Sequence, residues 1–172
     1  MAHKGVHATK VSDIAHRADI GVGTFYLHFE TKEALFDAMV ADTVRRLKDE
    51  IDVARRSVSG VIEQIRASTA ALCRFASANR EVFRVVFGHS GTYLRVVREA
   101  QELFAADIEV VLAEGMSQGL FTNVTPRLAA QAIIGMSTQL LAWCTEHADV
   151  PLAELEHTLN TLTLDGMCRA PA

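Results

Sequence analysis

The sequence predicts an all-helical (all-α) protein, and three observations support this fold class. Apolar residues recur at intervals of three and four along almost the whole chain, which is the spacing of one helix face. Alternation of β-branched and polar residues, the signal of a strand, never lasts for more than a few residues. The first proline is Pro126, so no proline interrupts a helix before that position.

Helices are expected in the following order. Two short helices separated by a tight turn come first, and because each is too short to be stable alone, they must pack together. A long helix follows, with Thr31 as its N-cap, and its second half, around residues 45–56, is the best candidate for a domain boundary. Later helices are separated by glycine-containing or turn-rich segments, and Thr125-Pro126 is typical of a helix start. The expected ranges are 11–18, 22–29, 32–56, 61–79, 81–87, 91–114, 126–147 and 151–162.

Composition and charge exclude several classes of protein. The 172 residues are 49% apolar and 22% charged, which is typical of a folded globular chain of one domain, or of a small domain fused to a larger one. The uncharged stretch 128–145 approaches the length of a membrane span, but its polar residues favour a buried helix in a protein without a membrane partner. We find no signal sequence, and the cysteines Cys73, Cys144 and Cys168 are odd in number, so we expect a cytoplasmic protein.

The charge distribution gives no general support for nucleic-acid binding. The net charge is -4, and residues 1–56 hold nine Lys/Arg and nine Asp/Glu, so the first third of the chain is neutral. A nucleic-acid binder usually has a basic patch, because phosphate contacts supply most of the affinity. Any prediction of DNA binding must therefore come from a local pattern.

Such a pattern lies in the second short helix. Phe25 and Phe29 are four residues apart and form one apolar face. The opposite face is uncharged and carries Gly23, Thr24 and Leu27. A small and apolar exposed face suits the major groove of DNA, where thymine offers a methyl group. A second interpretation stays open, in which the two short helices merely cap the bundle.

The segment 11–36 resembles the DNA-binding signature of the tetracycline-repressor (TetR) family of bacterial transcriptional regulators. The resemblance is carried by the letters VSDIAHRA from Val11, GTFYLHF from Gly23 and KEALF from Lys32. A weaker similarity follows at 115–121, Pro126, Gly135 and Trp143. The resemblance to the TetR family implies a helix-turn-helix DNA-binding domain, which we assign to residues 1–45, and a larger helical effector-binding and dimerisation domain, which we assign to residues 46–172.

The resemblance also implies the site residues for DNA. Ser12 and the second helix would contact bases or backbone, and Lys32 would donate to a phosphate. The residues implied are Ser12, Val22, Gly23, Thr24, Tyr26, Leu27, His28 and Lys32.

The sequence departs from the family pattern in the turn and at its start. Asp19 stands where the family usually has Gly, and Gly21 stands at the usual Ser cap; both are mild changes. The family's first helix, ahead of Gly5, is missing from this sequence. We therefore expect Ile14, Phe25 and Phe29 to be partly uncovered. Either the sequence starts late relative to the family, or the product reads DNA poorly.

The resemblance implies a homodimer and a small-molecule effector. The family's dimer interface is a four-helix arrangement of the last two long helices, and the leucine spacing three, four and three near the end gives modest independent support. The expected interface residues are Ile133, Met136, Leu140, Leu152, Leu155, Leu159 and Leu162. The candidate effector-pocket residues are Phe75, Phe83, Phe87, Tyr93, Gln101, Phe104, Met136 and Trp143, although aromatic residues at helical spacing are more often simply core.

These patterns predict a ligand-responsive DNA-binding regulator, most often a repressor in such a family, with double-stranded DNA and a hydrophobic or amphipathic effector as partners. No phosphate-binding loop, nucleophile elbow or zinc motif is present, so we predict neither an enzyme nor a cofactor or metal. The alternative is a helical dimer that binds a ligand or a protein partner without competent DNA binding. The neutral first third of the chain favours that alternative.

Overall fold

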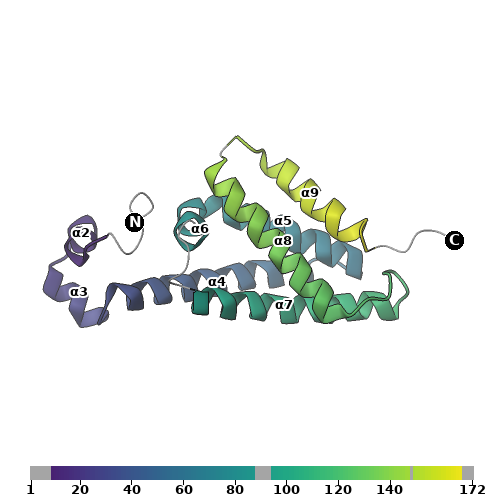
Figure 1. Ribbon diagram of the computed structural model, residues 1–172, viewed down its shortest axis with the longest axis horizontal. Coiled ribbons are helices and arrows are strands. Elements are labelled where there is room, and N and C mark those ends of the chain that lie inside the picture. Colours follow the sequence, from purple (N-terminus) through teal and green to yellow (C-terminus); the bar gives the residue numbers. More distant parts are fainter. Residues whose placement is uncertain (1–8, 88–93, 148, 168–172) are drawn as a thin grey trace.

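The computed structural model describes residues 9–87, 94–147 and 149–167, and these form helices joined by turns (Figure 1). The prediction of an all-helical fold is confirmed. The observed helices follow the expected order, and the longer ones end within a few residues of the expected positions. They are α2 (Val11–Arg17), α3 (Val22–His28), α4 (Lys32–Arg56), α5 (Val61–Ala78), α6 (Arg80–Phe87), α7 (Leu94–Ser117), α8 (Pro126–Glu146) and α9 (Leu152–Leu164).

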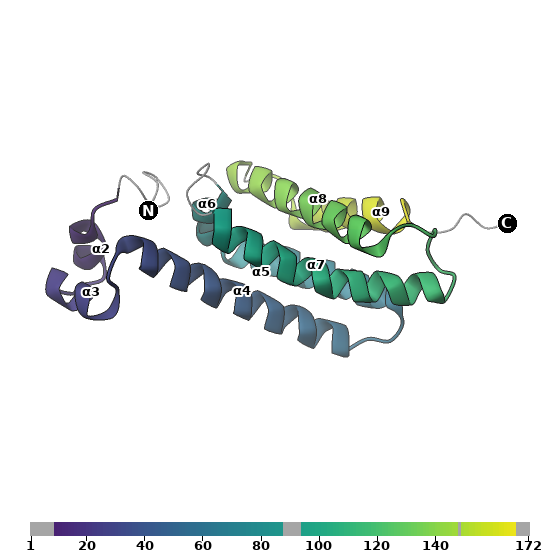
Figure 2. The ribbon, with the colours of Figure 1, turned by 60° about the horizontal axis from the view of Figure 1, so that its bottom comes forward.

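The helices are arranged with α2 and α3 at one end of the molecule and the larger bundle beside them (Figure 1). The long helix α4 runs from α3 along the bundle and lies next to α5 and α7. Figure 2 shows α4 on one side of the bundle, α5 and α7 in the middle, and α8 and α9 on the other side. The single rod α4 therefore joins the two parts of the chain.

The turn between α2 and α3 is built by Asp19 and Gly21. Asp19 adopts a left-handed backbone with φ of 54°, which a short polar residue tolerates better than most. Gly21 is the N-cap of α3. In α3 Phe25 is 2% exposed and packs on Phe29, with ring centroids 5.8 Å apart. The expectation that Phe25 would be partly uncovered is therefore wrong, whereas Ile14 and Phe29 are half-buried. The prediction about the family's first helix concerns the chain before Thr9, which lies outside the described part.

The start of α4 is fixed by a cap and by packing. The hydroxyl oxygen of Thr31 accepts a hydrogen bond from the backbone N–H of Ala34 at 3.0 Å, which confirms Thr31 as the N-cap. One turn later Phe36 and Val40 are buried, and Val86 of α6 and Val96 of α7 are among the residues that pack against them. The start of α4, which directly follows α3, is thus fixed to the bundle by an apolar contact.

The bundle has two apolar cores. One lies around Phe75, Phe83 and Leu159, and the other around Leu112 and Phe121. A close approach occurs at Gly115, where an added Cβ would lie 2.2 Å from the Phe121 ring. None of the described helices is long and apolar enough to cross a membrane.

Candidate DNA interface and effector cavity

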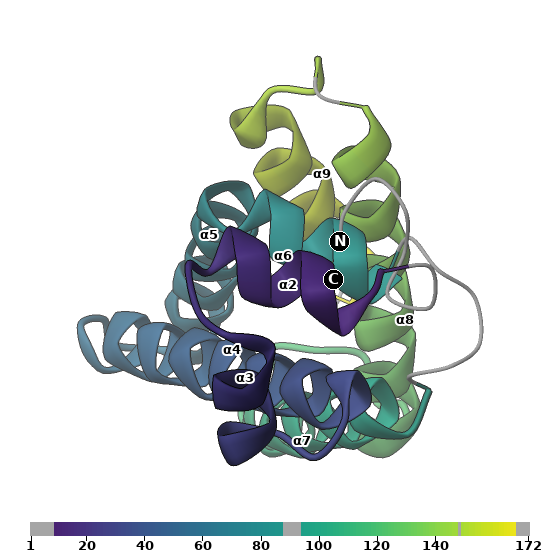
Figure 3. The same ribbon diagram turned by 90° about the vertical axis from the view of Figure 1, so that its left-hand side faces the viewer.

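The outward face of α3 is the candidate DNA interface. Leu27 is 83% exposed and Tyr26 54%, whereas Phe25 between the two helices is buried. Gly23, Thr24 and His28 are exposed as well. Figure 3 looks onto this end of the molecule, where α2 and α3 lie in front of the bundle. An exposed face of this shape, without a charged residue other than a histidine, fits a major groove, which admits an α-helix.

The remaining sequence-predicted DNA contacts differ in their surroundings. Val22 is 45% exposed, and Ser12 on α2 is exposed too, so both are accessible. Lys32 is half-buried, and its Nζ donates to the backbone oxygen of Thr9 at 3.3 Å. In this structure Lys32 therefore links the start of α4 to the segment before α2, a role that sequence reasoning did not foresee.

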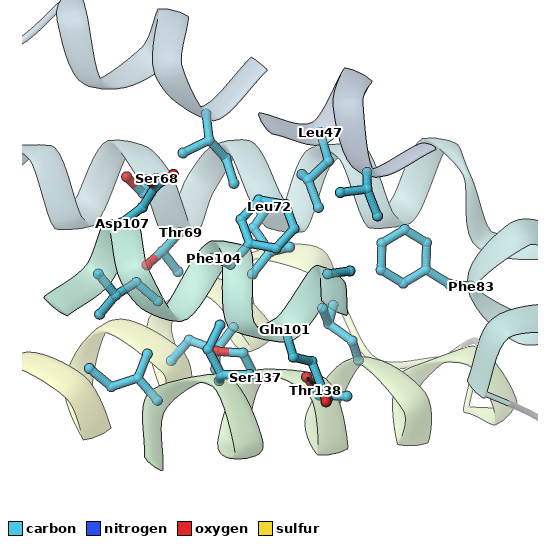
Figure 4. Close-up of a pocket in the computed structure, with 18 of the residues that line it drawn as sticks. Leu47, Ser68, Thr69, Leu72, Phe83, Gln101, Phe104, Asp107, Ser137 and Thr138 are labelled. Atoms are coloured by element: carbon cyan, nitrogen blue, oxygen red, sulfur yellow. Dashed lines mark hydrogen bonds between the residues drawn. The ribbon is translucent and has the colours of Figure 1, made fainter. Parts of the chain in front are cut away.

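A cavity of about 200 Å³ lies within the bundle, where α4, α5, α7 and α8 supply most of its lining and α6 and α9 supply the rest (Figure 4). The wall from α4 comes from one helix face, and includes Val40, Leu47 and Ile51. Most of the lining is apolar. A cavity of this kind takes an apolar ligand body.

Sequence reasoning found part of this cavity. Phe83, Gln101 and Phe104 line it, as expected. Phe75, Met136 and Trp143 do not line it, and their assignment needs correction: Phe75 is 1% exposed in the core, Met136 packs against that core, and Trp143 is 46% exposed and stacks on His147. The side chains of Phe87 and Tyr93 lie outside the described part of the structure.

Two charged side chains line the cavity, and both are half-buried. Asp107 of α7 accepts a hydrogen bond from Lys48 of α4, and the Nζ of Lys48 also lies 3.5 Å from Asp52. The hydrogen bond to Asp107 raises the pKa of Lys48, against the opposing effect of burial. Arg55, in the last turn of α4, makes no ion pair with any described residue. Neither the Lys48–Asp107 pair nor Arg55 was predicted, because the sequence of a helix does not show which other helix its charged residues will contact.

The outward face of α8 differs from the predicted dimer interface. Leu155 and Leu159 are buried in the chain's own core, and Leu152, Met136 and Leu140 pack against that core. Ile133 lines the cavity. Leu155 and Leu159 are therefore closed to a partner subunit, whereas Ile133, Met136, Leu140 and Leu152 are half-buried and Leu162 is 54% exposed. The exposed residues of α8 instead include an uncharged stripe, which we call the α8 stripe, of Leu128, Ala132, Gly135, Gln139 and Trp143.

The surroundings of the two described cysteines favour the protonated thiol. Cys73 is fully buried, and burial raises its pKa from 9.0 to about 12. Burial also raises the pKa of Cys144. Because the thiolate is the reactive form, both groups behave as small apolar residues at neutral pH. Within the described residues no group of three His, Cys, Asp or Glu could hold a metal ion.

The sequence of this chain is similar to two family profiles and to a known regulator. Residues 1–39 match the profile of the bacterial regulatory proteins of the tetR family, and residues 58–167 match the tetracyclin repressor-like C-terminal domain. The fatty acid metabolism regulator protein of Bacillus subtilis is 25% identical over 97% of this chain and 89% of its own length.

Two solved structures have the same fold. The fatty acid degradation regulator FadR of Bacillus halodurans is 26% identical, with a TM-score of 0.86 over 96% of this chain and 89% of that one. FadR of Bacillus subtilis, solved in complex with stearoyl-CoA, is 22% identical, with a TM-score of 0.76 over 96% and 92% of the two chains. The second profile alone covers more than half of the chain, and together with the helix-turn-helix it establishes that this protein belongs to the TetR family of DNA-binding transcriptional regulators.

Proposed function

We propose that this protein is a homodimeric repressor that leaves its operator when a long-chain acyl thioester occupies the cavity. The observation that carries the proposal is the position of α4. One face of α4 lines the cavity, the same helix follows directly after α3 in the chain, and Phe36 and Val40 near its start pack against α6 and α7. A ligand that displaces the cavity wall therefore acts directly on the reading helices.

The chemistry of the cavity favours an amphipathic effector. Its apolar walls suit an acyl chain, and Arg55, which lines the cavity and makes no ion pair with a described residue, suits an anionic head group; Lys48 lies next to this end, paired with Asp107 and Asp52. The stearoyl-CoA of the B. subtilis structure combines these two features. A sugar or a free nucleotide would leave its polar groups unpaired against the apolar walls.

The α8 stripe and Leu162 are proposed as the dimer interface. Leu128 is 68% exposed and Trp143 46%, although both are large and apolar. Gly135 lies in the middle of the stripe, and nothing comes within 4 Å of a Cβ placed there. A glycine in an exposed helix interior costs about 1 kcal/mol relative to alanine, which is reasonable where a second helix must approach closely.

The dimer converts effector binding into release. Two recognition helices read half-sites about one turn of DNA apart, so a change in their separation removes contacts at one half-site or both. The proposed DNA contacts are the exposed residues of α3 with Ser12, while Lys32 also holds Thr9. We also propose that the DNA-binding domain ends at residue 45 and that the protein acts in the cytoplasm.

The test is a fluorescence-anisotropy titration of the full chain against the DNA that flanks its own gene, with and without stearoyl-CoA, at two salt concentrations. We expect tight and salt-steep binding, because phosphate contacts release counterions. Stearoyl-CoA should lower operator affinity at least tenfold. Binding of stearoyl-CoA without any DNA binding would instead support the helical ligand-binding dimer, which the neutral charge of residues 1–56 favours.

A further inference from the structure

The cavity contains a small polar cluster on its α7–α8 side. Gln101 of α7 donates from Nε2 to the Oγ1 of Thr138 of α8 at 3.4 Å, and Ser137 adjoins Thr138. Figure 4 shows these three side chains together, apart from Ser68 and Asp107. We call Gln101, Ser137 and Thr138 the polar cluster.

The polar cluster has unused hydrogen-bonding capacity. The Oε1 of Gln101 and the hydroxyl of Ser137 make no hydrogen bond to any described residue. The hydroxyls of Ser68 and Thr43, on other walls of the same cavity, each donate to a carbonyl of their own helix, at 2.7 and 2.8 Å. Serine in a helix commonly satisfies itself in that way, and Ser137 does not.

An apolar ligand body laid across the polar cluster would strip water from these groups and leave them unpaired. An unpaired buried donor or acceptor costs more than a hydrogen bond gains, so the cluster selects against a plain hydrocarbon at this point. A hydroxyl or carbonyl oxygen on the ligand would restore the lost bonds, because the Gln101 amide and the two hydroxyls can each both donate and accept.

The position of the polar cluster separates it from the proposed head-group end. Gln101 and Asp107 are six residues apart on α7, which is about 9 Å along a helix axis. A ligand whose charged head lies near Asp107, Lys48 and Arg55 therefore meets the cluster part-way along its apolar body.

On these grounds, and resting on the proposed function, we infer that the effector is an oxygenated acyl thioester, and that Gln101 and Ser137 recognise a hydroxyl or keto oxygen in the body of its chain. Thr138 positions the Gln101 amide through their hydrogen bond. The polar cluster is then a specificity determinant that separates an oxygenated chain from a saturated one.

The experiment measures the dissociation constants of stearoyl-CoA and of a series of hydroxystearoyl-CoA molecules with the hydroxyl at successive chain positions. We expect one position to bind about fivefold to tenfold more tightly than stearoyl-CoA, the range of one net hydrogen bond. Gln101→Met and Ser137→Ala should each bring that ratio close to one. Ser137→Ala removes no hydrogen bond among the described residues, so it keeps the test valid if Gln101→Met fails to fold.

A matched control is Gln131→Met. Gln131 of α8 also donates to α7, to Glu102 at 3.2 Å, but it lies outside the cavity, so its loss should leave the ratio unchanged. The inference is overturned if no hydroxylated chain binds more tightly than stearoyl-CoA, or if the preference persists in both cavity variants. Release of the operator by stearoyl-CoA with a ratio of one leaves the proposed function standing and removes this inference. Failure of every acyl-CoA to bind overturns both.

Discussion

Replacement of Gly135 by leucine should affect the subunit and the dimer in opposite directions. Gly135 is exposed in the middle of α8, and nothing lies within 4 Å of a Cβ built there. Within one subunit the new side chain meets open space and replaces the poorest ordinary helix former apart from proline. In the proposed dimer the same side chain lies where two helices cross.

The magnitudes of the two effects follow from the structure. The subunit should gain about 0.8 kcal/mol of helix stability. Overpacking costs about 1–3 kcal/mol for each inserted side chain, and a two-fold axis inserts two, so the dimer should lose about 2–6 kcal/mol. A loss of about 2 kcal/mol, the lower end of this range for the dimer, already weakens dimerisation about 30-fold.

The assay is sedimentation equilibrium at several concentrations, with far-ultraviolet circular dichroism of the diluted subunit as the measure of its own stability. Glu50→Leu is the matched control, because Glu50 is exposed on α4 and makes no ion pair with a described residue. That variant should dimerise normally. Unchanged dimerisation of Gly135→Leu, or equal weakening by Glu50→Leu, would refute the assignment of the α8 stripe as the interface.

Three further predictions concern other parts of the chain. Gly115→Ala should destabilise the fold by about 1–3 kcal/mol and lower the melting temperature by about 2–12 °C, because its Cβ would lie 2.2 Å from the ring of Phe121; a melting curve unchanged from the parent would contradict this. Tyr26→Phe removes one exposed hydroxyl per subunit and should weaken operator binding about tenfold while stearoyl-CoA affinity stays the same, which titration of both ligands checks. The raised pKa of Cys73 favours the protonated thiol in the folded state, so its contribution to stability is complete below pH 9 and should fall by about 1.4 kcal/mol per pH unit as the pH rises toward 12; urea unfolding of Cys73→Ala should lack that slope.

Helix positions were predictable because their signals are local. Thr31 supplies a cap whose hydrogen bond the structure contains, and Gly21 begins α3 as its position indicates. The exposed face of α3 could also be deduced, since Phe25 and Phe29 fix which side is buried and leave Leu27 exposed. In each case the signal lies within one short segment of the chain.

The rotational setting of α8 could not be deduced in this way. Residues 128–145 carry no charge, so apolar side chains occur around most of the helix and the pattern has no polar face to mark solvent. The spacing therefore favoured Ile133, Met136 and Leu140 for the interface, whereas in the structure these three are half-buried against the cavity or the chain's own core, and Gly135 and Trp143 are exposed. For the same reason Trp143, the largest side chain, was assigned to the pocket. Long-range packing against α6 and α7 decides the orientation, and it leaves no trace in the spacing.

The contact between α4 and α7 explains how the cavity can control the reading helices. Among the described residues, the ion pairs that join different helices are Lys48–Asp107 and Arg95–Asp37, and both connect α4 to α7. The other ion pairs of that part of the chain lie within a single helix. Half-buried and exposed charges exchange one partner for another, or for water, at low cost, whereas a packed apolar contact resists sliding. Under the proposed function, an anionic effector replaces the Lys48–Asp107 ion pair beside the cavity, while Phe36 and Val40 keep the first turns of α4 packed against α6 and α7.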